Sequence, residues 1–330
     1  MEGSPLKAHL VPSQLSVFDA ASGKRVWFLS HAEGSDRIVC DESARECLWL
    51  MRRGEIKTMA AANSKTVVLT GATDGMGSVV APMLAKAGYF VVVHGRSPER
   101  GKAVVDKIVK AGGQAKFTAC NLASLKDVRR FAGALNAEFD RIDLLINNAG
   151  IGTWPNGAPR EVSVDGLELR FAVNYLAGYL LTRLVLDRVK AAAPARIINV
   201  ASEGQEPIDF SDPMLEQNYS GYFAYCRSKV ADVMFTIDLA DELKDSGVTV
   251  NAMHPGAFMN TTMVRVMKHA VVDSLDEGAS FLFELATHRR FDGVTGRYIN
   301  RGVDSRAKAQ CYDGEARARL RELSNKLVGL

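Results

Sequence analysis

The stretch Thr66-Val-Val-Leu-Thr-Gly-Ala-Thr-Asp-Gly-Met-Gly77 decides the fold of this chain. Its first half is an apolar, β-branched run without alternation, which is typical of a strand buried on both faces. Its second half is rich in glycine and leads into a helical pattern over residues 76–87, so the backbone can approach an anion at a helix N-terminus. A turn that merely needs positive φ is the alternative, but the strand–loop–helix context favours binding. The predicted pyrophosphate contacts are Gly71, Thr73, Gly75, Met76 and Gly77.

The alternation of strand and helix continues through the rest of the chain. Apolar runs at residues 89–94, 115–118, 143–147, 196–200 and 248–253 indicate further strands, and amphipathic patterns at residues 98–111, 125–139, 166–190 and 225–246 indicate helices. Parallel strands joined in this way need right-handed crossovers that cover both faces of the sheet. The sequence therefore predicts an α/β protein with a Rossmann-type, doubly wound parallel sheet over residues 63–330.

Residues 1–62 carry a different pattern, with shorter elements. The expected elements are strands at residues 15–20 and 24–29 with a turn at Ser22-Gly23, a third strand at residues 36–40, a helix from the capping box of Ser43 and Glu46 to Gly54, and a linker at residues 57–65. A unit this small is marginal without disulfides or metal. We expect a small N-terminal β-hairpin and helix extension that packs on the main domain or on a partner subunit.

The composition excludes several classes of protein. A net charge of +3 argues against a general nucleic-acid binder, whose basic face dominates the count. The five cysteines are an odd number without a Cys-x-x-Cys pair, and the six histidines lack metal-ligand spacing, so neither a disulfide framework nor a metal site is expected. No apolar run is as long as a membrane span and no secretory signal pattern is present, so we expect a cytoplasmic protein.

The end of the second strand bears on the choice of cofactor. In a dinucleotide-binding fold, an acidic residue at this point holds the ribose 2′-hydroxyl of NAD, whereas an arginine accommodates the 2′-phosphate of NADP. Here the strand ends in His94-Gly95-Arg96, and the guanidinium of Arg96 can pair with a phosphate. Asp74 and Glu99 add negative charge nearby, and a solvated surface arginine is the alternative. The residues favour NADP over NAD.

A tyrosine and a lysine form the candidate catalytic pair. Tyr225 and Lys229 are four residues apart and therefore share one face of an expected helix. A free tyrosine has a pKa of about 10. A nearby ammonium favours the phenolate, which makes such a tyrosine a usable general acid or base. Because this spacing also arises by chance, the pair needs support from the motifs around it.

Those motifs follow in a set order. After the glycine loop come Asn147-Asn148-Ala149-Gly150 at a strand end, Asn174 in a helix, Ser202 after the strand that ends at Val200, the Tyr225 and Lys229 pair, and His254-Pro255-Gly256. This series resembles the short-chain dehydrogenase/reductase family from about Lys65 to the C-terminus. Residues 165–174, 225–256 and 321–328 are similar to the branch that holds the retinol dehydrogenases and protochlorophyllide reductases.

The resemblance implies a role for each matched residue. The family's catalytic serine, tyrosine and lysine correspond to Ser202, Tyr225 and Lys229, and the asparagine of its proton relay corresponds to Asn174. Expected cofactor contacts, besides the glycine loop and Arg96, are Asn121, Leu122, Asn148, Ala149, Gly150, Tyr225, Lys229, Pro255 and Gly256. Asn121 departs from the usual aspartate, although an amide can still bond the adenine. Family members pair through two long helices, so we expect a homodimer or homotetramer through residues 166–190 and 225–246.

Three functions remain open from these residues. The first is an NADP(H)-dependent carbonyl reductase or alcohol dehydrogenase, in which Tyr225 exchanges the proton, Ser202 bonds the substrate oxygen and Lys229 bonds the nicotinamide ribose. The second is a reductase of carbon–carbon double bonds, because the Tyr/Lys pair specifies only where a proton goes. The third is a dinucleotide-binding sensor or scaffold without turnover.

The residues around the expected pocket indicate a largely apolar small-molecule substrate. Residues 257–272 follow Pro255 and include Phe258 and several methionines, which suits an adaptable lid, although a core helix is the alternative. The insert between Ser202 and Tyr225 is acidic and makes an anionic substrate unfavourable. Neither a nucleic acid nor a membrane span is expected as part of the function.

Overall fold

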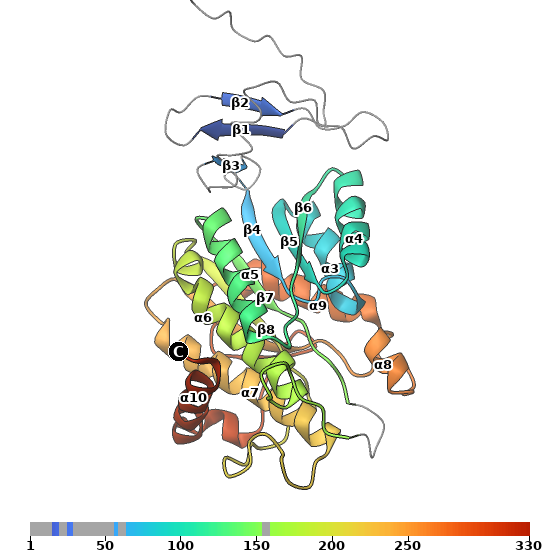
Figure 1. Ribbon diagram of the computed structural model, residues 1–330, viewed down its shortest axis with the longest axis vertical. Helices are drawn as coiled ribbons and strands as arrows, with labels where there is room; N and C mark the ends of the chain where they lie inside the picture. Colours follow the sequence, from blue (N-terminus) through green and yellow to red (C-terminus); the bar gives the residue numbers. More distant parts are fainter. Residues whose placement is uncertain (1–14, 20–24, 29–55, 59–63, 154–158) are drawn as a thin grey trace, which may run out of the picture. The chain divides into compact units, whose positions relative to one another are not determined.

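Two units make up the chain in the computed structural model (Figure 1). They are Met1–Ser64 and Lys65–Leu330, and each is considered by itself. The structure describes residues 15–19, 25–28, 56–58, 64–153 and 159–330.

The first unit contains a three-stranded antiparallel sheet in the order β2-β1-β3. Its strands are β1 (Leu15–Asp19), β2 (Arg25–Phe28) and β3 (Ile56–Thr58). Val17 of β1 lies opposite Val26 of β2, so the two strands of the predicted hairpin are present and paired. The predicted turn at Ser22-Gly23, the strand at residues 36–40 and the helix from Ser43 lie outside the described residues.

β3 corrects the prediction of a linker that begins at residue 57. Ile56 and Thr58 are β-branched, and such residues favour a pleated, paired backbone. Thr58 lies opposite Val17, and Ile56 lies opposite Asp19. A segment with the composition of a linker therefore contributes the third strand, because β1 offers it an edge to pair with.

The second unit is built on an eight-stranded sheet in the order β11-β10-β9-β8-β7-β4-β5-β6. The strands are β4 (Lys65–Leu69), β5 (Tyr89–Gly95), β6 (Gln114–Ala119), β7 (Leu144–Asn147), β8 (Ala195–Val200), β9 (Val248–His254), β10 (Tyr298–Asn300) and β11 (Val303–Ser305). All neighbours are parallel except β11, which is antiparallel to β10. The strand order reverses at β4, and ligands of open α/β sheets bind at such a switch point.

Helices cover both faces of this sheet, as predicted (Figure 1). α3 (Gly75–Lys86), α4 (Pro98–Lys110) and α9 (Leu275–Thr287) pack together on one face, and α5 (Leu125–Glu138), η1 (Phe171–Leu176), α6 (Ala177–Lys190) and α7 (Gly221–Glu242) pack on the other. α10 (Gly314–Val328) packs against α7, and the short α8 (Thr262–Val266) follows β9. The doubly wound α/β fold is thereby confirmed.

The central strands are buried on both faces, as their continuous apolar runs predict. Val67, Val68 and Leu69 of β4 are fully inaccessible, as is Val91 of β5. Fully burying such a side chain contributes about 1.5 to 3 kcal/mol relative to leaving it exposed. This rigid centre fixes the carboxyl ends of the strands, where the candidate site residues lie.

Two predicted helices have different starts in the structure. Residues 166–168 are not helical, because Gly166 adopts φ 79° and Glu168 forms an isolated bridge with Val162. The next turn, η1, is a π-helix. α7 begins four residues before the predicted start at Tyr225, since Ser220 caps it by accepting the N–H of Phe223 at 3.4 Å, and it ends before the predicted Ser246. α9, α10 and strands β10 and β11 have no counterpart among the predicted elements.

Candidate active site

The glycine loop connects β4 to the first turn of α3. Gly71 has φ 64°, a left-handed conformation that favours glycine. A Cβ at Gly77 would lie 2.3 Å from the carbonyl oxygen of Gly71, so a side chain does not fit there. The predicted contacts Gly71, Thr73, Gly75, Met76 and Gly77 therefore surround the N-terminus of α3, whose first backbone N–H groups can bind an anion.

Two polar side chains join this loop to the end of β7. Thr70 Oγ1 accepts hydrogen bonds from the backbone N–H groups of Asn148 at 2.9 Å and Ala149 at 3.0 Å. Asn148 Nδ2 donates to the carbonyl oxygen of Thr70 at 2.8 Å. The packing is close, because a Cβ on Gly71 would lie 2.8 Å from Ala149 Cα. The predicted segment Asn148, Ala149 and Gly150 is thus held beside the glycine loop.

His94, near the end of β5, supports the same loop from another strand. Its Nδ1 lies 3.1 Å from the backbone nitrogen of Gly71 and accepts that N–H, while its Nε2 lies 3.2 Å from the carbonyl oxygen of Cys120. One neutral tautomer satisfies both contacts. Burial lowers the pKa of His94 to about 4, and the nearby charge of Arg96 acts in the same direction. The ring is therefore neutral at pH 7 and keeps both bonds.

Two arginines stand on the side of the loop where β5 ends. Arg96 directly follows β5 and is exposed. Arg100, in the first turn of α4, lies 3.4 Å from Asp74 Oδ2, and Asp74 Oδ1 accepts the N–H of Gly75 at 2.7 Å. Asp74 therefore caps α3 and pairs with Arg100, which leaves the local charge less acidic than the sequence indicates. Arg100 is a second cation that the sequence analysis did not single out.

The two residues predicted near the adenine follow β6. Asn121 Oδ1 accepts the backbone N–H of Ala123 at 3.1 Å, so this amide shapes the turn that leads to α5. Leu122 is buried and lines a small pocket behind the loop. The side chain of Asn121 thus has a structural task in the turn besides any contact with a cofactor.

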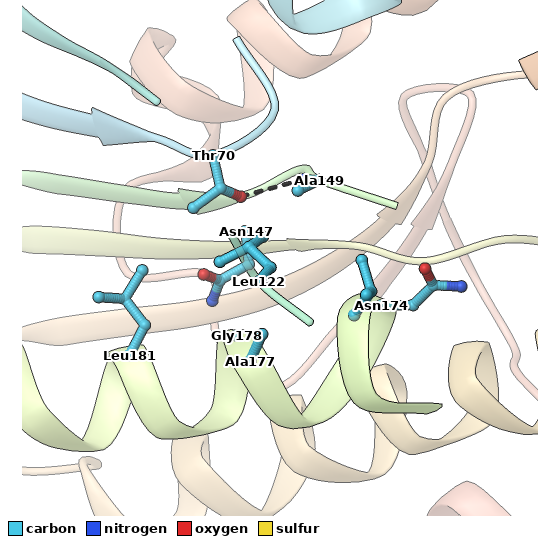
Figure 2. A pocket seen from close by; sticks show the side chains of 9 residues that line it. Thr70, Leu122, Asn147, Ala149, Asn174, Ala177, Gly178 and Leu181 are labelled. Atoms are coloured by element: carbon cyan, nitrogen blue, oxygen red, sulfur yellow. Dashed lines mark hydrogen bonds between the residues drawn. The ribbon is translucent and has the colours of Figure 1, made fainter. Parts of the chain in front are cut away.

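That pocket lies between the strand ends and α6 (Figure 2). It is lined by Thr70, Leu122, Asn147, Ala149, Val173, Asn174, Ala177, Gly178 and Leu181. It has room for about one water molecule, which is too little for a substrate. Asn147 Oδ1 is buried there without a hydrogen-bond partner among the described residues. The amide group of Asn174 points away from the pocket (Figure 2).

Asn174 lies in the π-helical turn η1, and such turns often occur at functional sites. Its Oδ1 accepts the N–H of Ile151 at 2.8 Å, and its Nδ2 donates to the carbonyl oxygen of Ile151 at 3.1 Å. Nδ2 also lies 3.0 Å from Ser228 Oγ on α7. Asn174 therefore fixes both the loop segment that follows Gly150 and the helix that carries the candidate catalytic pair.

The predicted catalytic side chains converge in the structure. A Cβ on Gly204 would lie 3.5 Å from Ser202 Oγ and 3.7 Å from Tyr225 Cε1, so these two side chains flank the same point. Lys229 Nζ lies 6.0 Å from the centre of the Tyr225 ring. A Cβ on Gly150 would lie 3.9 Å from Lys229 Nζ. Tyr225 is half-buried and can meet a ligand, whereas Ser202 and Lys229 are buried.

The ammonium of Lys229 has two fixed partners. Nζ donates to the carbonyl oxygen of Val200 at 2.7 Å and to Asp232 Oδ2 at 2.9 Å. Both Lys229 and Asp232 are 5% exposed, so the pair is largely removed from water. Desolvation raises the pKa of Asp232 to about 6, against the opposing effect of Lys229. Asp232 was not among the predicted site residues.

The predicted residues Pro255 and Gly256 begin the loop after β9, which is closed at its base. Asp273 Oδ2 accepts the N–H of Ala257 at 2.7 Å, and the N–H of Asp273 donates to the carbonyl oxygen of Ala257 at 3.1 Å. Arg301 Nη2 donates to the same Asp273 oxygen at 2.8 Å, and its Nη1 lies 3.2 Å from Glu203 Oε2. Ala257 and Asp273, at the two ends of the loop, are thus bonded to each other, and Arg301 links Asp273 to Glu203.

His254 is buried beside this cluster and stays neutral. Its Nε2 lies 3.6 Å from Glu203 Oε2, which is too long for a hydrogen bond. Burial lowers the pKa of His254 to about 4, although the charge of Glu203 opposes the shift. At pH 7 the ring therefore carries no charge and forms no ion pair with Glu203.

The segment 257–272 contacts the opening of the site from two sides. A Cβ on Gly75 would lie 3.1 Å from Thr261 Cγ2, and a Cβ on Gly152 would lie 2.6 Å from Met263 Cγ. Four large apolar side chains of the segment are exposed, namely Phe258, Val266, Val271 and Val272. These contacts place the segment over the glycine loop and over Gly152. Its action as a mobile lid remains a prediction.

A buried arginine anchors the other edge of the site. Arg170 is fully buried, and its Nη1 donates to Tyr219 OH at 2.7 Å and to Glu168 Oε1 at 3.3 Å. Its Nε donates to the carbonyl oxygen of Gly152 at 3.1 Å. Tyr219 belongs to the predicted acidic insert, and burial raises its pKa to about 12. The insert is therefore joined to the chain that enters η1, at the edge of the site.

Most predicted site residues come together, but several supporting residues were missed. Around the glycine loop and the catalytic pair these are Thr70, His94, Arg100, Asp232 and Arg301. Only Asp232 had a signal in the sequence, because a carboxylate three residues after Lys229 shares its helix face. No group of three or more potential ligand side chains that could hold a metal occurs in the described part of the chain.

A helix N-terminus behind a glycine loop, with a serine just after β8 and a tyrosine and a lysine on α7, defines a dinucleotide-binding oxidoreductase. The family model described as short chain dehydrogenase matches residues 65–271. The human protein named Retinol dehydrogenase 13 is 36% identical over 298 residues, which covers 84% of this chain and 88% of that protein. The chain belongs to the short-chain dehydrogenase/reductase family, in its retinol dehydrogenase branch.

Solved structures agree with this assignment. An uncharacterized protein from Mycobacterium Paratuberculosis has a TM-score of 0.66 and 28% identity, and covers 82% of this chain and 97% of its own. The RhlG/NADP active-site complex of Pseudomonas aeruginosa has a TM-score of 0.59 and 26% identity, and covers 72% and 94%. The protein is thus an NAD(P)-dependent oxidoreductase with a small-molecule substrate. None of the helices in the described part of the chain is both long and apolar enough to span a membrane.

Proposed function

We propose that the protein interconverts a carbonyl and an alcohol on a largely apolar small molecule, with NADP(H) as the hydride carrier. The observation that carries the proposal is the convergence of Tyr225 and Ser202 on one point beside Gly204, with the buried Lys229 behind the Tyr225 ring. A substrate oxygen held within reach of both hydroxyls could accept a proton from Tyr225 and a hydrogen bond from Ser202. The names of the retinol dehydrogenase relatives favour an apolar alcohol or aldehyde.

The residues around the glycine loop suit a dinucleotide. Gly71 and Gly77 leave no room for a side chain of their own, so an anion can approach the backbone N–H groups at the start of α3. The loop would hold the pyrophosphate, Asn148 to Gly150 and Lys229 would hold the nicotinamide half, and Arg96 and Arg100 would meet a 2′-phosphate. The cofactor supplies or receives the hydride when bound. The two cations beside the loop support NADP over NAD.

The chain's own residues handle the proton. In the reducing direction, the Tyr225 hydroxyl gives its proton to the carbonyl oxygen as a hydride reaches the carbonyl carbon, so that a carbonyl becomes an alcohol. The ammonium of Lys229 stabilises the phenolate that remains. Ser202 Oγ, which accepts the N–H of Gly204 at 3.1 Å, keeps its own hydrogen available for the substrate oxygen.

A direct comparison of substrates and cofactors tests the proposal. Purified protein is assayed with NADPH and with NADH on an apolar ketone, on the matched aldehyde and on the corresponding enone. We expect alcohol products and a higher kcat/KM with NADPH, and Arg96→Asp should reverse the cofactor preference. Saturated ketone as the product of the enone would favour the double-bond reductase. Cofactor binding without turnover of any of these compounds would favour the sensor.

Assembly and location are expectations of the same proposal. We infer a homodimer or homotetramer in the cytoplasm. α6 and α7, the helices expected to pair, expose few residues, because α10 packs against α7 and Tyr179 OH of α6 donates to Asn325 Oδ1 of α10 at 2.6 Å. A pairing surface on this side would therefore include α10. Light scattering of the purified full chain gives the state, and a monomer would contradict the inference.

A further inference from the structure

A buried carboxylate lies against the lysine of the candidate catalytic pair. Asp232 Oδ2 is 2.9 Å from Lys229 Nζ, and both residues lie on α7, one turn apart. The side chain of Lys229 is 6% exposed and that of Asp232 is 7% exposed, so little water screens the two charges. The proposed function assigns no task to Asp232.

The other acidic residues of α7 that form ion pairs, including Glu242 with Arg183 of α6, pair with a second helix. Asp238 pairs with Arg321 of α10 at 2.6 Å, and Asp241 pairs with Arg317 at 3.4 Å. Both pairs join two helices and are partly exposed, as expected of contacts that stabilise packing. The pair of Asp232 joins no second element. The carboxylate of Asp232 therefore acts most directly on the charge and position of the Lys229 ammonium.

We propose that Asp232 is a positioning residue for Lys229: its carboxylate holds the ammonium between Val200 and the Tyr225 ring and offsets part of the positive charge that Tyr225 experiences. Two of the three N–H groups of the ammonium are directed to Val200 O and Asp232 Oδ2. The third is left for a ligand such as a ribose hydroxyl. The inference rests on the proposed function, because it assigns Asp232 to the proton transfer by Tyr225.

The effect of the Asp232 carboxylate on Tyr225 has a definite direction. The ammonium of Lys229 stabilises the phenolate of Tyr225, and the carboxylate of Asp232 weakens that effect. Replacing the carboxylate by a neutral amide of the same shape leaves the full positive charge beside Tyr225. The phenolate then forms at a lower pH, so the rate of alcohol oxidation, which needs the phenolate as the base, reaches half its maximum at a lower pH.

Other titratable groups around the pair do not produce this shift. From η1, Tyr175 faces Asp232, and its hydroxyl lies 2.7 Å from Ser324 Oγ. Burial raises the pKa of Tyr175 well above its usual value, so it stays neutral. From the strand ends, His254 is neutral at pH 7, and the Glu203 and Asp273 carboxylates pair with Arg301. Tyr175 and His254 therefore keep the same charge between pH 6.5 and 9.

The test compares Asp232→Asn with wild type and with the matched control Asp238→Asn. The control removes a carboxylate from the same helix, but this carboxylate pairs with Arg321 and not with Lys229. We expect Asp232→Asn to move the half-maximal pH of kcat/KM for alcohol oxidation down by about 1 unit, the scale of one nearby charge. Asp238→Asn should leave the profile in place. Below about pH 6 wild type and Asp232→Asn should converge, because burial raises the pKa of Asp232 to about 6.

A second readout separates this inference from the proposed function. The ultraviolet difference titration between each protein and its Tyr225→Phe partner reports phenolate formation at Tyr225 without turnover. An equal downward shift in this titration supports the inference even if no carbonyl is reduced. An unchanged or upward shift in Asp232→Asn, or the same downward shift in Asp238→Asn, overturns it. If Asp232→Asn fails to fold, Asp232→Ser gives the same comparison.

Discussion

The cofactor half and the substrate half of the site are built in different ways. In residues 65–150 every described residue with a left-handed backbone is a glycine. In the substrate half, non-glycine residues adopt that conformation, namely Leu215, Asn218, Phe258, Lys268 and Arg301. A left-handed conformation costs an ordinary residue roughly 1 to 2 kcal/mol. The cofactor half is therefore specified by local sequence, whereas the substrate half is held by contacts that offset local strain.

Exposure divides the two halves in the same way. The strands beneath the glycine loop are fully buried, and polar side chains fix the loop from β5 and β7. On the substrate side, Phe258, Val271 and Val272 are exposed without apolar cover. The cofactor side is therefore a rigid platform, and the other side carries exposed apolar side chains.

The largest expected effect is on catalysis itself, with cofactor binding left intact. Tyr225→Phe removes the proton donor but leaves the ring and the fold, so kcat should fall by about 10²- to 10⁴-fold, the usual contribution of a general acid. The dissociation constant of NADPH, measured by its fluorescence, should stay within about twofold, well under the 1.4 kcal/mol of a tenfold change. Turnover that survives in Tyr225→Phe would show that another group carries the proton.

The next effect belongs to the cofactor half. Gly77→Ala places a Cβ 2.3 Å from the carbonyl oxygen of Gly71, and the backbone of the loop must shift. NADPH affinity should weaken by about 10²-fold, or about 2.7 kcal/mol. The matched control is Gly133→Ala on α5, where a Cβ meets nothing within 4 Å. The control should bind NADPH normally and gain up to about 1 kcal/mol in stability. Equal NADPH affinity in the two variants would show that the glycine loop is not part of the cofactor site.

A third prediction concerns Asp232 and how the free energy of unfolding depends on pH. Burial raises the pKa of Asp232 to about 6, so its ionised form destabilises the folded state, and the stability of wild type falls as pH rises from about 4 to above 6. At pH 8, Asp232→Asn should therefore be more stable than wild type by about 1 to 3 kcal/mol. The difference should vanish near pH 4. Urea unfolding at both values of pH measures it, and a loss of stability at pH 8 would show that the ion pair is net stabilising.

The smallest effect belongs to the substrate half. Arg301→Gln releases Asp273 and loosens the base of segment 257–272. KM for an apolar substrate should rise about tenfold, equal to about 1.4 kcal/mol, while NADPH affinity stays unchanged. The control Arg297→Gln removes an exposed ion pair, in which Arg297 Nε lies 3.8 Å from Asp304 Oδ2 of β11. A rise in KM with both variants, or with neither, would contradict a specific role for Arg301.

Residues that belong to local motifs could be predicted from sequence, whereas residues whose role depends on distant partners could not. The glycine loop, Arg96, and the Ser202, Tyr225 and Lys229 group follow strands in a recognisable order, and the structure brings the last three together. His94 was missed because its role depends on the N–H of Gly71, 23 residues away. Arg301 was missed because its partners Asp273 and Glu203 are 28 and 98 residues away.

The element predictions failed in the same region. α9, α10, β10 and β11 lie after the last motif, and the two edge strands are only three residues each. Short edge strands carry little periodicity of their own, and their pairing depends on β9. η1 was predicted as part of a longer helix because hydrophobic periodicity does not distinguish a π-helical turn from an α-helical one. Local signals therefore describe most elements up to β9 well and the elements after it poorly.

The most direct test of the central claim is the product formed from an apolar enal by the purified full chain with NADPH deuterated at nicotinamide C4. The proposal predicts the allylic alcohol, with deuterium on the former carbonyl carbon and the double bond intact, and loss of this product in Tyr225→Phe. Deuterium on the β-carbon with a retained aldehyde would contradict it.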